Sequence, residues 1–247
     1  MYEKPKILIC GDKAVTVEFG DELSEECNKR VIIKLYRMFK LKKIEGIISM
    51  IPTYRSLLIK YDPFKITYYE LIKLVELYNN NDTEKEEVKA KVYEIPVVYG
   101  GEFGLDLDFV ARYNNLTVEE VISIHTKPLY RIFMIGFTMG FAYLGGMSEK
   151  IATPRLEKPR TEVKAGSVGI AGNQTGIYPI SSPGGWRIIG RTPIKIYNPT
   201  AENPILLETG NFIKFVRITE DEYRKIEKEV QLNRYHVKIY DYNDYKS

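Results

Sequence analysis

Residues 135–199 read IGFTMGFAYLGGMSEKIATPRLEKPRTEVKAGSVGIAGNQTGIYPISSPGGWRIIGRTPIKIYNP, and this stretch is the most informative part of the chain. Glycine and proline recur throughout it, and it also carries four arginines and Trp186, the only tryptophan of the chain. Glycine and proline bend the backbone or let it approach another group closely. Their dense alternation with polar residues therefore predicts the functional surface here.

The length, composition and charge of the chain are those of a globular protein. The chain has 247 residues, of which 44% are hydrophobic, and this is enough for one large or two modest domains with buried cores. Lysine and arginine number 36 against 33 acidic residues, and the net charge of +3 is spread along the chain, so no nucleic-acid partner is expected. No stretch approaches the roughly 18 apolar residues of a membrane span, which predicts no membrane contact and a cytoplasmic location.

The cysteine and histidine usage predicts neither a disulfide nor a metal site. Cys10 and Cys27 are the two cysteines, and two cysteines in a chain of this size usually stay reduced inside the cell. His125 and His236 are the two histidines, and neither has metal-ligand spacing to a cysteine. No metal is therefore expected.

The first third of the chain predicts a small α/β sandwich. The Gly11-Asp12 pair separates two β-like runs, as in a hairpin. Apolar residues then recur every three or four positions in two segments, which is typical of amphipathic helices packed on a sheet. Two helices against about four strands favour a ferredoxin-like arrangement. The expected strands are residues 6–10, 14–19, 44–51 and 56–61, and the expected helices are residues 22–39 and 68–78.

Polar residues 79–89 separate this part from a second one that is mainly β. Few contacts are expected to cross such a charged segment, so the sequence predicts domains at residues 1–85 and 90–247. Short β-like runs between glycine and proline turns then indicate a barrel, which makes the whole chain α+β. Capping-box spacing starts two helices, at Thr117 and Thr219, and the tyrosine-rich tail forms an edge strand or docks on a partner. The expected strands are residues 130–137, 167–171, 176–180, 186–190, 194–197 and 211–218.

The second part contains a series of glycine-, proline- and arginine-containing motifs. They are YGGEFGLDL (99–107), HT (125–126), GFxxGFxYLGG (136–146), ATPR (152–155), PRT (159–161), AGSVGIAG (165–172), QTGIYPI (174–180), SPGGW (182–186) and GRTP (190–193). In order and spacing they resemble the KipI/PxpB family, which comprises 5-oxoprolinase subunit PxpB and the proteins similar to subunit 1 of allophanate hydrolase. One departure is Met139, where the family usually has proline.

The resemblance implies a fold and a function. The fold would be a cyclophilin-like β-barrel at the C-terminal end. The function would be that of one subunit of an ATP-dependent 5-oxoprolinase, which opens the lactam of 5-oxoproline to give glutamate. Such a subunit works with a PxpC-like (KipA or subunit 2) protein and a PxpA-like hydrolytic subunit, and is expected to be inactive alone. The alternative is a KipI-type inhibitor of a sensor histidine kinase, which would use the same surface.

Arginines and hydrogen-bond donors are the candidate site residues. A guanidinium group binds carboxylate or phosphate through two parallel contacts, whereas a surface arginine can also simply brace a loop. Amide and hydroxyl groups beside a turn can hold a ligand or serve the turn itself. The chain offers no activated nucleophile, so binding and electrostatic stabilisation are expected. Catalytic roles are predicted for Arg160, Gln174 and Tyr178, and substrate-binding roles for Tyr143, Arg155, Thr175, Trp186 and Arg191.

Overall fold

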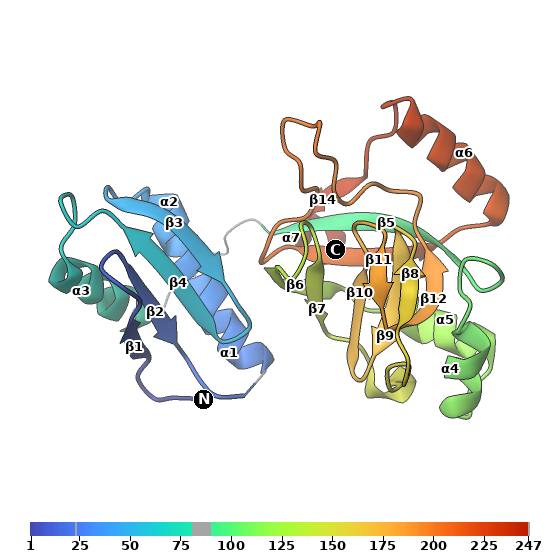
Figure 1. Ribbon diagram of the computed structural model, residues 1–247, viewed down its shortest axis with the longest axis horizontal. Helices are drawn as coiled ribbons and strands as arrows, with labels where there is room; N and C mark the ends of the chain where they lie inside the picture. The colour runs from blue at the N-terminus through green and yellow to red at the C-terminus, as the bar shows by residue number, and fades with distance from the viewer. Residues whose placement is uncertain (23, 81–89, 247) are drawn as a thin grey trace. The chain divides into compact units, whose positions relative to one another are not determined.

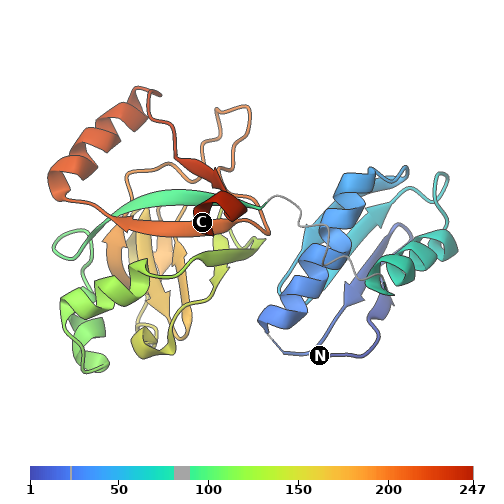
Figure 2. The ribbon, with the colours of Figure 1, turned by 180° about the vertical axis from the view of Figure 1, so that it is seen from behind.

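The protein forms two compact units, Met1–Lys89 and Ala90–Ser247. A computed structural model describes residues 1–22, 24–80 and 90–246 (Figures 1 and 2). Each unit has its own core of buried apolar side chains. The predicted boundary segment, residues 80–89, lies almost wholly outside the described residues. That the two ranges are independent folding domains stays a prediction.

Unit 1 is an antiparallel four-stranded sheet with its helices on one face, as Figure 2 shows. Apolar side chains alternate along the central strands, and Val15, Val17 and Leu57 meet Leu35 and Val75 from the helices in one core. The sheet order is β1-β2-β4-β3. The elements are β1 (Lys6–Ile9), β2 (Ala14–Glu18), a continuous helical stretch of α1 (Glu25–Lys29), η1 (Arg30–Arg37) and α2 (Met38–Lys42), β3 (Ile47–Pro52), β4 (Ser56–Tyr61) and α3 (Tyr68–Asn80).

The α/β layering of unit 1 is as expected, but its chain order is not ferredoxin-like. The described elements run β-β-α-β-β-α, whereas a ferredoxin-like fold runs β-α-β-β-α-β. The tight turn after Ile9 pairs β1 directly with β2, and this leaves no room for a helix between them. The ferredoxin-like detail is therefore not confirmed.

Unit 2 is built on a closed mixed β-barrel, which confirms the predicted barrel. Within the described residues, seven strands follow one another in the order β12-β9-β10-β7-β6-β13-β5, and β12 pairs again with β5 to close the ring. The β5–β13 pair is parallel. The strands are β5 (Lys91–Tyr99), β6 (Tyr130–Ile135), β7 (Ala142–Gly145), β9 (Ser167–Ala171), β10 (Gln174–Ile177), β12 (Arg187–Arg191) and β13 (Phe212–Arg217).

Short elements surround the barrel. β8 (Arg160–Val163) pairs with β11 (Ser182–Gly184) in a separate ladder. Both predicted capping boxes are present, at Thr117 for α5 (Val118–Thr126) and at Thr219 for α6 (Glu220–Gln231). The tail forms the edge strand β14 (Ile239–Asp241) on β5, followed by α7 (Tyr242–Lys246), whose Tyr242 stacks on Phe212. The remaining helices are α4 (Leu107–Tyr113) and η3 (Glu149–Ile151).

One predicted strand, residues 194–197, is wrong. Pro193 and Pro199 flank this segment and donate no backbone hydrogen bond, so only an isolated bridge forms, between Tyr197 and Ile205. A strand that the sequence did not predict, β7, follows a glycine-rich loop and is only four residues long.

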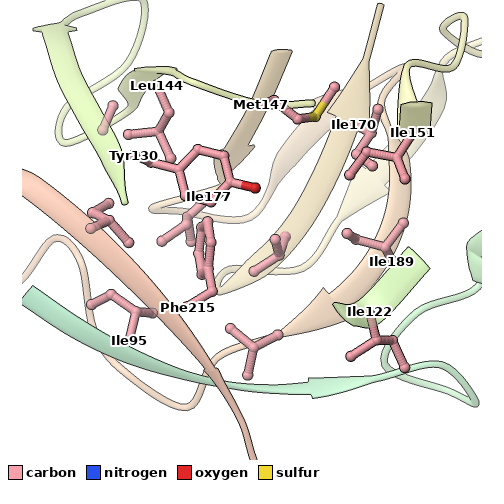
Figure 3. Packing of buried hydrophobic residues seen from close by; sticks show 14 of the residues in the cluster. Ile95, Ile122, Tyr130, Leu144, Met147, Ile151, Ile170, Ile177, Ile189 and Phe215 are labelled. Carbon is pink, nitrogen blue, oxygen red and sulfur yellow. The ribbon is translucent and has the colours of Figure 1, made fainter. Parts of the chain in front are cut away.

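The barrel interior is a packed core and not a channel. Figure 3 shows Ile95, Tyr130, Leu144, Ile177 and Phe215 converging from different strands. Side chains of successive strand residues point to opposite faces, so each strand contributes every second residue to this core. The intervening residues are left for the outer surface, where most of the predicted site residues lie.

Gly190→Ala tests the closure of the barrel. Gly190 pairs with Tyr99, and a Cβ at position 190 would lie 2.6 Å from the Val98 carbonyl oxygen. We expect the variant to lose about 1–3 kcal/mol of unfolding free energy through overpacking, seen as a fall of several degrees in Tm. Gly185→Ala is the matched control, because its nearest neighbours would lie 3.6 Å or more away. Equal melting temperatures for the two variants would contradict this role.

Candidate functional site

An aromatic cluster lies on the outer face of the barrel. Along β12, Ile189 belongs to the interior core while its neighbour Ile188 belongs to the outer cluster, and Leu144 and Tyr143 divide in the same way on β7. The β8–β11 ladder contributes Val163 to it. We call this group the outer aromatic cluster; it consists of Phe141, Tyr143, Val163, Ala171, Tyr178, Trp186 and Ile188.

Two glycines explain why Trp186 can lie flat against the barrel. A Cβ on Gly176 would lie 3.1 Å from the indole, and one on Gly169 would lie 3.1 Å from the Trp186 Cβ. Even an alanine at either position would require Trp186 or its neighbours to shift by a few tenths of an ångström. Phe141 and Tyr178 then meet Trp186 edge to face, with ring centroids 5.5 and 6.3 Å away. The glycine-rich sequence therefore serves close packing at this place.

Tyr178 is held as a neutral phenol in this cluster. Its side chain is buried, and burial raises the pKa of the hydroxyl because the phenolate would lose hydration, although Arg155 and Arg160 nearby act in the opposite direction. A protonated phenol can donate a hydrogen bond to a carbonyl oxygen. Tyr178 therefore has the protonation state that its predicted role requires.

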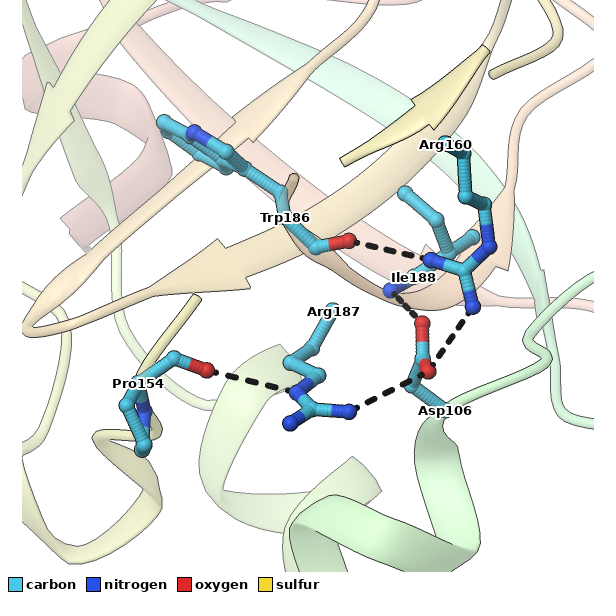
Figure 4. A network of polar contacts seen from close by, with 6 residues as sticks. All are labelled: Asp106, Pro154, Arg160, Trp186, Arg187 and Ile188. Atoms are coloured by element: carbon cyan, nitrogen blue, oxygen red, sulfur yellow. Dashed lines mark hydrogen bonds and ion pairs between the residues drawn. The ribbon is translucent and has the colours of Figure 1, made fainter. Parts of the chain in front are cut away.

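Asp106 organises the polar groups beside the cluster, as Figure 4 shows. It precedes α4 and accepts a hydrogen bond from Nη2 of Arg160 at 2.9 Å and one from the Ile188 amide at 2.7 Å. Arg187 Nη1 lies 3.8 Å from the same carboxylate, and its guanidinium stacks over Phe109 at 3.7 Å. The carboxylate is 8% exposed, so this pairing is largely shielded from water.

The contacts of Asp106 change the expected part of Arg160. Its guanidinium also donates to the Trp186 carbonyl oxygen at 3.4 Å, so it ties β8 to both α4 and β12. Asp106 was not among the predicted site residues, although the YGGEFGLDL motif contains it. The sequence signal was an aspartate in this motif, with Arg160 in the PRT motif and Arg187 directly after SPGGW. Only the folded structure shows that these three residues lie together.

Arg155, Gln174 and Tyr143 lie at the rim of the outer aromatic cluster. Arg155 is exposed, and within the described part of the chain it takes part in no hydrogen bond or ion pair. Gln174 begins β10 and is partly buried, and the Tyr143 ring lies 5.1 Å from that of Phe141. Arg155 is thus a positive charge available to a ligand carboxylate.

The structure does not bring Thr175 and Arg191 to this rim. Thr175 is fully buried in the barrel interior, on the opposite face from Tyr143. Arg191 stands four residues from Arg187 on β12, or about 13 Å in an extended strand, and its guanidinium lies over Phe103. Membership in a sequence motif therefore does not determine which side chains lie at the rim.

Thr175 instead takes part in a buried chain of hydrogen bonds that runs through His125. The Thr175 hydroxyl donates to the Gly169 carbonyl oxygen at 3.0 Å, so its oxygen accepts from Nε2–H of His125 at 2.9 Å. Nδ1 of His125 then accepts from the Tyr99 hydroxyl at 2.8 Å. Burial lowers the pKa of His125 to about 3, because the imidazolium would lose its hydration. The imidazole therefore stays neutral and joins barrel strands rather than shuttling protons.

A hollow of about 550 Å³ lies between one end of the barrel and α6. Pro179, Ser181 and Lys195 line it from the barrel side, and Tyr223 and Glu227 from α6. No predicted site residue lines this hollow. Among residues 1–22, 24–80 and 90–246, no group of three or more His, Cys, Asp or Glu side chains is placed to hold a metal ion. None of the helices in the same ranges is long and apolar enough to cross a membrane.

The pH dependence of stability tests the neutral state of His125. Its pKa is lowered in the folded state, so as the pH falls the unfolded chain takes up the proton first and stability is lost between about pH 6.5 and 3. At about 1.4 kcal/mol per pH unit below pH 6.5, unfolding free energy should fall by about 2 kcal/mol between pH 8 and 5. His125→Gln, measured by denaturant titration, should remove this dependence. A wild-type protein equally stable at both pH values would contradict the assignment.

Comparisons with known proteins agree with this architecture. The chain matches the family model of the carboxyltransferase domain, subdomain C and D, over residues 5–207. A 5-oxoprolinase subunit of Bacillus subtilis (strain 168) is 43% identical over 229 residues, which is 89% of this chain and 95% of that protein. The uncharacterized protein PH0987 from Pyrococcus horikoshii is 51% identical, with a TM-score of 0.53 over 88% of this chain and 100% of that one.

A longer protein shares the same fold. The crystal structure of TTHA0988 superposes with a TM-score of 0.70 at 36% identity, and the match covers 84% of this chain but 40% of that chain. These findings confirm the resemblance to the 5-oxoprolinase subunit PxpB group that the motifs indicated. Because the family model spans most of its length, the chain belongs to the carboxyltransferase domain, subdomain C and D, family.

Proposed function

We propose that this chain is one subunit of an ATP-dependent 5-oxoprolinase, which converts 5-oxoproline to glutamate. The observation that carries the proposal is the 43% identity to a 5-oxoprolinase subunit over 95% of that protein. A protein named as a subunit works with others, and we assign a PxpC-like and a PxpA-like subunit as partners in the cytoplasm. The relatives named above give no support to the histidine-kinase inhibitor alternative.

The chemistry requires binding and polarisation more than nucleophilic attack. A lactam resists hydrolysis, and transfer of the γ-phosphoryl group of ATP to its carbonyl oxygen would make the ring carbon a better electrophile. Water would then add to this carbon and the C–N bond would break, which frees the amine and leaves an acyl phosphate. A second water would hydrolyse the acyl phosphate to glutamate and phosphate. His125 lies neutral inside the barrel and cannot activate a nucleophile at the outer surface. This subunit would therefore hold and orient the substrate in a cyclophilin-like barrel domain.

We assign the substrate to the rim of the outer aromatic cluster. Arg155 would bind the carboxylate of 5-oxoproline, because its charge has no partner in the described part of the chain. Tyr178 and Gln174 would donate hydrogen bonds to the lactam carbonyl, with Tyr143 and Trp186 bounding the ring. Arg160 would position Trp186 through its contacts with Asp106 and the Trp186 carbonyl.

Two of the arginines that could hold a triphosphate beside the outer aromatic cluster are already paired within the chain. Arg160 and Arg187 direct their charges to Asp106, so they are not available to a triphosphate. A Cβ on Gly184 would collide with the Tyr178 hydroxyl, so that backbone is closed off by the ring. We therefore assign ATP to the complex, with its phosphates held chiefly by a partner subunit.

Reconstitution tests the function. The chain would be co-expressed with its PxpC-like and PxpA-like partners, and glutamate formation from 5-oxoproline measured with and without ATP. We expect activity from the complete set with ATP and none from this chain alone. A purified complex of all three that forms no glutamate would contradict the proposal.

Paired arginine variants test the division of roles. Arg155→Ala should lower kcat/KM for 5-oxoproline by roughly 10- to 150-fold, the loss of one charged hydrogen bond of about 1.5–3 kcal/mol, without changing Tm. Arg160→Ala should lower Tm as well as activity, because it leaves Asp106 short of a partner. Arg224→Ala, at an exposed arginine of α6, is the control for both. Normal kcat/KM for Arg155→Ala would remove this residue from the site.

A further inference from the structure

The loop of residues 136–140, which joins β6 to β7, exposes two large apolar side chains. Phe137 is 80% exposed and Met139 is 59% exposed. Among the large apolar side chains of the described part of unit 2, Phe137 is the most exposed. Aromatic and methionine side chains are enriched at protein interfaces, where they fill pockets of the partner.

This loop is fixed by its own backbone. The Gly136 amide donates to the Phe141 carbonyl at 3.0 Å, the Phe141 amide to the Thr138 carbonyl at 3.2 Å, and the Thr138 amide to the Gly136 carbonyl at 2.8 Å. Gly140 has a φ of 85°, and a Cβ there would lie 3.2 Å from the Tyr197 Cβ and 3.3 Å from that of Pro179. The loop thus packs closely on its base, so little ordering entropy would be lost when a partner binds.

The backbone at Phe137 adopts a conformation that is unfavourable for an aromatic residue. Its φ is 66°, in the left-handed region that glycine and asparagine adopt far more readily than an aromatic residue. Its exposed ring recovers little of this cost through packing within the chain. Residues that are strained and exposed at once are typical of binding sites, where the gain comes from the partner.

Residues of the outer aromatic cluster lie beside the loop, and together with Arg155 they enlarge the surface that a partner could contact. The Phe137 ring lies 6.1 Å from Phe141 of the outer aromatic cluster. Arg155 lies near Tyr178 of the same cluster and offers an exposed positive charge. A socket that fits this surface would be apolar, with no basic group at its edge.

The comparison with TTHA0988 indicates which protein would supply the socket. The present chain corresponds to 40% of that chain, so in TTHA0988 the same fold is joined covalently to a further segment longer than itself. In an enzyme whose function is divided among subunits, as proposed above, the equivalent of that segment belongs to a partner. The exposed loop is a surface on which such a subunit could dock.

We propose that Phe137 and Met139 insert into an apolar socket on the subunit that corresponds to the remaining part of TTHA0988. This inference rests on the proposed function, because it places that subunit in the same complex. Phe137 is the anchor, Met139 fills the adjacent space, and Arg155 at the border remains available to the substrate carboxylate.

Phe137→Asn should weaken binding to the partner without destabilising the isolated chain. Asparagine tolerates the left-handed conformation, so the Tm of the isolated chain should stay unchanged or rise. The Kd for the partner, taken from the same source organism and measured by calorimetry, should rise about 30-fold, as at an interface hot spot. Met139→Ser should raise the Kd about tenfold. A structural role alone would lower Tm and binding together.

Phe64→Asn and Leu105→Ser are the matched controls, because these side chains are 94% and 63% exposed elsewhere in the chain. Both should bind the partner like the wild type. A wild-type complex that Phe137→Asn leaves equally tight would overturn the docking inference and leave the proposed function standing. A wild-type chain that does not bind this partner would overturn both. Wild-type self-association that Phe137→Asn abolishes would assign the loop to a second copy and overturn the proposal.

Discussion

The architecture of unit 2 follows from closure of the barrel between β12 and β5. The pairing of Gly190 with Tyr99 joins two strands far apart in sequence, and only a residue without a side chain fits against the Val98 carbonyl. Closure removes the free edges of the ring and gives every strand an inner and an outer face. Ile189 and Ile188, neighbours in sequence, consequently serve the interior core and the outer aromatic cluster.

The same closure brings the buried charge of Asp106 beside β12. Its carboxylate accepts the Ile188 amide and the Arg160 guanidinium, with Arg187 close by. A carboxylate shielded from water is costly unless it is paired and hydrogen-bonded, and here it is both. The arrangement uses two arginines to hold the framework and leaves Arg155 as the charge that faces outward.

The proposed substrate rim and the 136–140 loop are continuous through Phe141. Its ring forms edge-to-face pairs with Phe137 of the loop and with Tyr178 and Trp186 of the outer aromatic cluster. A partner seated on the loop would therefore cover the rim, exclude water from it and strengthen the electrostatic contacts there.

Features that depend on neighbouring residues could be predicted from the sequence alone. Short β-like runs between glycine and proline turns predicted the strands of a barrel, and capping boxes predicted the starts of α5 and α6. The motifs identified the family. The relations between distant residues emerged only from the folded chain: Arg160 pairs with Asp106, 54 residues away, Thr175 turns into the interior, and Arg191 stands at the far end of its strand from Arg187. The order of the elements in unit 1 was as predicted, but the pairing of its strands likewise emerged only from the folded chain. Local chemistry fixes conformation, but the partner of a charge is set by distance in space, which only the closed barrel defines.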